Sequence, residues 1–195
     1  MHVWPEKILF VIWLCCPILN YAILNYLNTT GEKFIMVDTF AHGLWSWIIF
    51  RNIKPTSDVW LAVFFGVMPD LFSWAVYMFY RFFTTGFKFG APVLGEIPKW
   101  PFVLYGITHS IFVFGAVVLG LYFILGHVPY WILAWGIHIL IDIPTHSRNF
   151  LPTPFLWPFF DWYFPGISWG TWWIMALNWG GIIIALIYIF FFGKR

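Results

Sequence analysis

Long apolar stretches, separated by short polar or proline- and glycine-containing connections, fill almost the whole chain. A helix of about 20 apolar residues crosses the hydrocarbon core of a bilayer, and a helix satisfies its own backbone hydrogen bonds there. The stretches are residues 8–27, 34–50, 59–83, 102–125, 130–143 and 169–192. We therefore predict an all-α, polytopic membrane helical bundle of five to six transmembrane helices, forming a single domain over residues 1–195.

Composition favours the same class. Only 9% of the residues are charged, whereas soluble domains carry about 25%, and 62% are hydrophobic. We expect an integral membrane protein of the plasma or inner membrane. The net charge of +2 provides no basic face for nucleic acid, which we exclude as a partner.

Neither the N-terminus nor the charged residues orient the chain. Residues 8–27 are long for a signal-peptide core and lack a small-x-small cleavage site, so we predict a first membrane span there. The adjacent Cys15 and Cys16 lie inside this stretch and suit packing better than metal binding or redox chemistry. With six spans, lysine and arginine divide equally between the two sides, and the positive-inside rule gives no orientation.

Proline and capping residues mark local features of the spans. Pro69 should kink the stretch 59–83 just before Asp70, and Ser57 or Asp58 is the expected N-cap of that helix. The proline-rich, aromatic segment 144–166 is typical of the membrane interface, where Trp and Tyr concentrate.

Ionisable residues inside the apolar stretches are few and are almost all His or Asp. Such groups are costly to bury in a membrane and usually serve a function, and both types bind divalent metals. They are Asp38, His42, Asp70, His109, His138 and Asp142, with His146 just beyond the fifth stretch.

Spacing groups these residues. Asp38 and His42 are four apart, as are His138 and Asp142, and residues at i and i+4 share one helix face. Each pair can therefore present a carboxylate and an imidazole to one point in the bundle. Pro144 disfavours helical geometry at the residue before it, so the chain should turn there and bring His146 back over the site.

Depth in the membrane agrees with this grouping. His42, His109 and His138 each lie roughly nine residues, or about 13 Å, into their stretches. Antiparallel neighbours meet at that depth. The carboxylates of the two pairs lie about one turn nearer the side that carries the connections 84–101 and 144–167, where we expect the site to open.

Three interpretations of this cluster remain open. The side chains can be hydrogen-bonded packing residues, with or without a metal that only braces the bundle. They can line a proton or ion pathway, because transporters also place Asp and His at mid-membrane. The wealth of His and the lack of a visible broken-helix repeat favour a metal-dependent enzyme.

Four motifs resemble the YdjM-like family of membrane-bound metal-dependent hydrolases. They are "FAHGLW", "VMPDLFSW", "YGITHSIFVF" and "GIHILIDIPTHSRNFLPTPFLWPF", which occur in the order found in that family within residues 38–159. The wider resemblance is to zinc-dependent phospholipase C and single-strand nucleases, in which an all-α bundle holds a zinc cluster. It implies His42, Asp70, His109, His138 and Asp142 as metal ligands, with Asp142 bridging.

Two departures from the family pattern alter the expectation. Leu104, Tyr105 and Gly106 stand where the family has His-Arg-Gly, so a phosphate-binding arginine is missing, and Arg148 is the candidate to replace it. The soluble enzymes also carry a later His-x-x-x-Glu pair, which is absent here after His146. One or two metal ions are therefore expected rather than three.

Together these observations predict a membrane-embedded, metal-dependent hydrolase, phospholipase-like, that cleaves a phosphoester bond in a membrane lipid or lipid-linked substrate. Zinc is the favoured cofactor, with manganese as the alternative. Asp70 or Asp38 would orient water or act as general base, Arg148 would offset phosphoryl charge, and His146 would be an outer ligand. The alternative function is translocation of an ion or small solute through the same cluster. The sequence does not set the oligomeric state.

Overall fold

A computed structural model of the chain describes residues 35–86, 92–149 and 151–193, which form helices and irregular connections without a strand. The predicted span 8–27 and the cysteine pair lie outside the described residues. In chain order the elements are α2 (Ile35–Phe50), α3 (Ser57–Asp70), the π-helical η1 (Leu71–Ala75), α4 (Val76–Thr85), η2 (Leu94–Glu96), α5 (Lys99–His109), α6 (Ile111–Leu125), η3 (Tyr130–Ile132), α7 (Leu133–Thr145) and α8 (Trp172–Phe192). The prediction of an all-α fold is confirmed for these residues.

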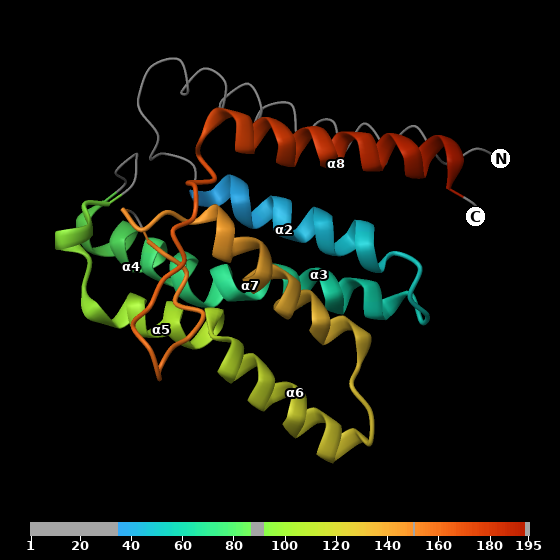
Figure 1. The fold of residues 1–195 in the computed structure, drawn as a ribbon, viewed down its shortest axis with the longest axis horizontal. Helices are drawn as coiled ribbons and strands as arrows, with labels where there is room; N and C mark the ends of the chain where they lie inside the picture. Colours follow the sequence, from blue (N-terminus) through green and yellow to red (C-terminus); the bar gives the residue numbers. More distant parts are fainter. Residues whose placement is uncertain (1–34, 87–91, 150, 194–195) are drawn as a thin grey trace.

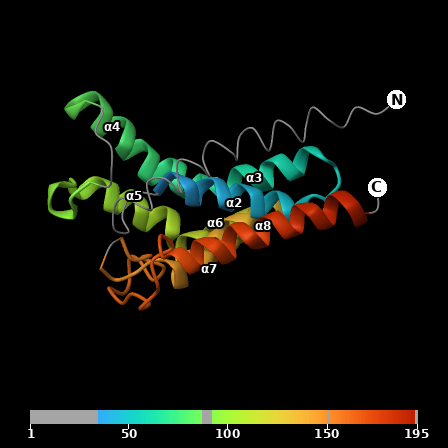
Figure 2. The same cartoon turned by 90° about the horizontal axis from the view of Figure 1, so that it is seen from above.

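The central helices lie side by side (Figures 1 and 2). α3 packs against both α2 and α7, and α8 lies along the outer side of α2. α4, α5 and the irregular segment after α7 gather at one end of the bundle, while α6 diverges from the others toward the opposite end (Figure 1). The carboxyl end of α7 and the junction of α3 with η1 therefore face this irregular segment.

Two described helices are long and apolar enough to cross a membrane by length and composition: the continuous helix Ser57–Thr85, of 29 residues, and Trp172–Phe192, of 21. The pair α5 and α6 makes a third if its two helices, bent by 51°, count as one span. α2 has 16 residues, about 24 Å of helix against a hydrocarbon core of about 30 Å. The described residues thus contain two to three candidate membrane spans. The prediction of five to six transmembrane helices is not confirmed.

Large apolar side chains cover the outside of the bundle. Phe123 and Ile124 of α6 are 77% and 79% exposed, and Ile184 of α8 is 70% exposed. Soluble proteins rarely expose large contiguous apolar patches, so these surfaces fit contact with lipid.

Local expectations at two helix ends were wrong. Ser57 is already helical and its hydroxyl contacts the neighbouring Asp58 carboxylate, so neither residue caps α3. Pro69 lies inside the helix, as predicted, and the chain changes from α-helical to the π-helical η1 after Asp70, where the Ser73 hydroxyl bonds to the Pro69 carbonyl. Pro144 likewise lies inside the last turn of α7.

The turn that was expected at residue 143 occurs at His146, which has φ −110° and ψ 124°. The His146 N–H still bonds to the Asp142 carbonyl at 3.1 Å. This places the His146 side chain one turn beyond Asp142, and the turn itself lies three residues later than expected.

Candidate metal centre

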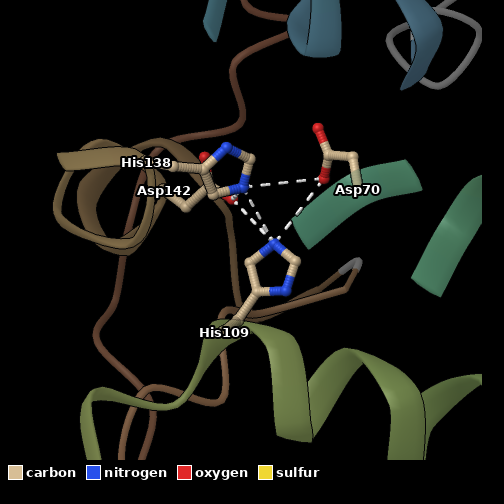
Figure 3. Close-up of side chains that lie close together, drawn as sticks. All are labelled: Asp70, His109, His138 and Asp142. Carbon is tan, nitrogen blue, oxygen red and sulfur yellow. Dashed lines mark hydrogen bonds and ion pairs between the residues drawn. The ribbon is translucent and has the colours of Figure 1, made fainter. Parts of the chain in front are cut away.

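Four ligand-type side chains converge where α3, α5 and α7 meet (Figure 3). Asp70 ends α3, His109 ends α5, and His138 with Asp142 lies on one face of α7. Each offers one nitrogen or oxygen atom, and these atoms all lie within 4.8 Å of one another. The two histidines and Asp142 are at most 1% exposed, so the cluster is buried.

A break between α5 and α6 positions His109. Ser110 has extended geometry (φ −86°, ψ 129°), and its hydroxyl oxygen accepts bonds from the Phe112 and Val113 N–H groups, which caps α6. The Ser110 hydroxyl donates to the Trp157 carbonyl, which ties the break to the segment after α7. The single span predicted over 102–125 is therefore two helices, and His109 stands at their junction.

Hydrogen bonds fix the tautomers of the two central imidazoles. Nδ1 of His138 lies 2.7 Å from the Gly66 carbonyl oxygen, which only accepts, so Nδ1 carries the hydrogen. Nδ1 of His109 lies 2.9 Å from the Thr108 hydroxyl, whose own hydrogen goes to the Leu104 carbonyl at 3.0 Å. Nδ1 of His109 is then the donor as well. In the neutral rings, both Nε2 atoms are left with lone pairs.

These lone pairs face each other and two carboxylates. The two Nε2 atoms are 3.1 Å apart, and they lie 3.3 Å (His109) and 3.2 Å (His138) from Asp142 Oδ2. Their distances to Asp70 Oδ1 are 3.6 and 3.7 Å. Tetrahedral zinc with bonds of about 2.1 Å separates its ligand atoms by about 3.4 Å. Two imidazole lone pairs this close repel unless a cation or a proton lies between them, so the donor set fits a divalent ion.

Asp142 joins this cluster to a second group made of Asp38, Asp142 and His146, whose ligand atoms also lie within 4.8 Å of one another. His42 Nε2 lies 2.9 Å from Asp142 Oδ1 and 3.7 Å from Asp38 Oδ1. His146 Nδ1 lies 3.9 Å from Asp142 Oδ1. The two oxygens of Asp142 therefore face different sets of histidines, an arrangement suited to a carboxylate that bridges two ions.

Unpartnered atoms at Asp142 support this reading. Both of its carboxylate oxygens and His42 Nε2 are buried without a hydrogen-bond partner among the described residues. Asp142 lies within 2.9–3.3 Å of three imidazole nitrogens, which offset its charge only where those nitrogens carry a hydrogen. Beside imidazole lone pairs a buried carboxylate costs several kcal/mol, and coordination of a cation removes that cost. The residues present thus fit a metal centre that the resemblance implies.

The cluster gathers seven of the eight predicted site residues. Arg148 is the exception. It is exposed, its Nε donates to the Tyr163 carbonyl at 2.8 Å, and its guanidinium lies 5.9 Å from the Trp162 ring centroid. Arg148 has no contact with the candidate metal ligands among the described residues, and hydrogen bonding and ring contact hold it against the irregular segment.

Two cavities adjoin the ligands. The larger, about 70 Å³, lies beside Asp38 and His42 and has an apolar wall that includes Trp45, Ile141 and Met175. The smaller, about 20 Å³, is lined by Asp38, Asp70, Trp74, Tyr105, His146, Leu151 and Trp169. Asp38 and Trp169 line both. The segment after α7 thus borders both cavities, on the side where the sequence predicted the opening.

The residues that orient the candidate ligands were not predicted from the sequence. The Gly66 carbonyl holds His138, and the Thr39 hydroxyl donates to Asp70 Oδ2 at 2.7 Å. Ser110, a good N-cap residue type directly after His109, was a usable signal for the break. The other two carry no signal in the sequence, since their partners are 72 and 31 residues away.

We expect Thr39→Val to weaken metal binding by about 10- to 100-fold, the range seen when a residue that orients a ligand is lost. The Thr39 hydroxyl donates a hydrogen bond to Asp70 Oδ2, which keeps Asp70 Oδ1 directed at the histidines. Competition with a chromophoric chelator measures the affinity. Thr84→Val removes an exposed hydroxyl that bonds within its own helix and is the matched control. Equal affinities of the two variants would contradict the orienting role.

Comparisons with known proteins give no relative. No protein-family model matches the chain, and neither a curated protein nor a solved structure does.

Proposed function

We propose that this protein is a membrane-embedded hydrolase that uses one or two divalent ions, zinc first, to cleave a phosphoester bond in a lipid or lipid-linked substrate. The observation that carries the proposal is the buried cluster in which two imidazole lone pairs and two carboxylates face one point. The motif resemblance to membrane-bound metal-dependent hydrolases supports the reaction class.

A bound divalent ion lowers the pKa of its water toward about 7 and so supplies hydroxide at neutral pH. The chain's own residues then have separate tasks. His109, His138 and Asp142 hold the ion, and Thr39 keeps one oxygen of Asp70 directed at the cluster. Asp38 lines both cavities and is the proposed general base that takes a proton from water.

The larger cavity supports a lipid-like substrate. Its ligand end carries Asp38 and His42, and the remainder is mostly apolar, with residues of α2, α7 and α8. A polar group bound at the ligands would leave room for an apolar portion against Met175 and Ile174. Arg148 does not enter this proposal, because it lies away from the ligands.

One observation favours translocation as a second candidate. α5 and α6 form a bent pair, broken at Ser110 beside His109. Transporters bind ions at such breaks in their spans.

Purified full-length protein in lipid nanodiscs decides between the two. We expect one or two zinc ions per chain by elemental analysis and release of phosphate or phosphomonoester from a panel of phospholipids. Chelation should stop the release and added zinc should restore it. Metal-dependent solute flux in proteoliposomes without any hydrolysis would favour translocation, and full activity in a metal-free preparation would refute the metal mechanism.

His146→Ala should lower hydrolysis by only about 10- to 100-fold, the range expected when a residue supports a ligand rather than holding the ion alone. His146 is 3.9 Å from Asp142 Oδ1 and is less buried than the other histidines of the site. His138→Ala should lose more, because its Nε2 is 3.2 Å from Asp142 Oδ2. Initial rates of both variants on one lipid substrate test the order, which a larger loss in His146→Ala would reverse.

A further inference from the structure

Two buried hydrogen-bond donors stand beside the metal centre without a partner. The Trp74 indole nitrogen and the Tyr105 hydroxyl each lack a hydrogen bond within the described residues. Trp74 is 4% exposed and Tyr105 is 3% exposed. Buried polar groups are nearly always paired in proteins, so unpaired ones call for a bound molecule.

Both side chains line the same small cavity. Trp74 belongs to the π-helical η1 that follows Asp70, and Tyr105 lies one turn before His109 in α5. Asp38, Asp70 and His146 line that cavity as well. The side chains that carry the two unpaired donors therefore border the space next to the proposed metal ligands.

Packing holds the two rings in place. Trp74 and Tyr105 belong to one apolar cluster with Tyr77, Ile97 and Leu151. The Tyr105 ring also lies 4.0 Å from the His109 ring, centroid to centroid. Donors that are fixed before a ligand arrives are suited to stabilise charge that develops on an oxygen atom.

We propose that the Trp74 N–H and the Tyr105 O–H form an anion hole that binds a non-bridging oxygen of the substrate's phosphoryl group. This proposal rests on the proposed function and deepens it. An indole N–H can only donate, so it selects an acceptor oxygen. The cavity volume of about 20 Å³ accommodates about one oxygen-sized group.

The carboxylates around the cavity make anion binding dependent on a cation. Asp38 and Asp70 line the same cavity and repel an anion. The anion hole therefore binds a phosphoryl oxygen only when a divalent cation offsets these carboxylates. Metal-free protein is therefore expected to bind no phosphate.

The test uses full-length, zinc-loaded protein in nanodiscs and inorganic phosphate as the probe. Calorimetry should show that Tyr105→Phe and Trp74→Phe each weaken phosphate binding by about 10- to 100-fold, the size expected for one hydrogen bond to a charged group. Zinc content should stay at the wild-type value, because neither residue is a proposed ligand. Trp179→Phe is the matched control, since its indole nitrogen is also buried and unpartnered but its side chain lines neither cavity.

A spectroscopic readout separates binding from packing. In ¹⁵N-tryptophan-labelled wild type, phosphate should shift the indole resonance that is missing in Trp74→Phe, and it should not shift that of Trp179. Unchanged phosphate affinity in Tyr105→Phe, which removes one oxygen atom, together with an unshifted Trp74 resonance would overturn the anion hole while zinc binding stands. A chain that binds no zinc would instead refute the proposed function, and this proposal with it.

Discussion

Asp142→Asn is expected to empty the proposed metal centre and to lower the proposed hydrolysis by about 10³-fold or more, the size seen when a group on which a reaction depends is removed. Asp142 is the residue common to both groups of ligand-type atoms. Its Oδ2 faces His109 and His138, and its Oδ1 faces His42. The amide has the same shape but supplies no negative charge to offset a divalent ion.

In the absence of metal, Asp142→Asn should not lower the stability of the protein below that of wild type. The wild-type carboxylate is then buried against the imidazoles of His42, His109 and His138 without a cation, whereas a neutral amide is easier to bury. Metal-free Asp142→Asn should therefore unfold at a temperature no lower than metal-free wild type, while zinc should raise the unfolding temperature of wild type alone. Elemental analysis, lipid hydrolysis and thermal unfolding of nanodisc samples provide the three measurements.

Asp161→Asn is the control for this experiment, because Asp161 is exposed in the irregular segment after α7. It should match wild type in all three measurements. Wild-type zinc content and hydrolysis in Asp142→Asn would mean that the cluster is polar packing, and the metal mechanism would fail.

The convergence of the ligands was predictable because it depends on helix periodicity. Spacing of four residues places Asp38 with His42, and His138 with Asp142, on common helix faces, and this holds whatever the neighbouring helices do. Equal depth in the spans then brings His109 to the same level. The structure joins these side chains within hydrogen-bonding or ion-pair distances.

The shapes of the helices were less predictable. α5 and α6 are both apolar, so composition does not reveal the break, which depends on the capping hydroxyl of Ser110 and its bond to the Trp157 carbonyl. α2 matches the predicted stretch 34–50 to within one residue, but an apolar run shows where a helix is compatible with lipid and not whether it crosses the membrane.

The position of Arg148 was not predictable for a different reason. Its six-residue separation from Asp142 suggested proximity, but the chain leaves α7 at His146 in extended geometry. Arg148 then bonds to Tyr163, 15 residues away. Contacts in irregular segments follow from tertiary packing and have no periodic signal in the sequence.

Gly66→Ala is expected to destabilise the protein by about 1–3 kcal/mol, the usual cost of overpacking, and to weaken metal binding as well. A Cβ atom at Gly66 would overlap the Ser46 hydroxyl oxygen and lie 2.8 Å from Ser46 Cβ, so α2 and α3 must move apart. The Gly66 carbonyl also accepts the hydrogen bond that orients His138. Separation of these helices therefore disturbs His42 and His138 together.

A second substitution distinguishes this steric mechanism from a general effect on the helix. Ser46→Gly removes both atoms that the new Cβ would approach most closely, so the double variant Ser46→Gly, Gly66→Ala should recover much of the unfolding temperature and zinc affinity lost in Gly66→Ala. Gly115→Ala in α6 is the control, because a Cβ there meets nothing within 4 Å, and it should bind zinc as wild type does. If the double variant binds zinc no better than Gly66→Ala, contact between α2 and α3 does not set the geometry of the centre.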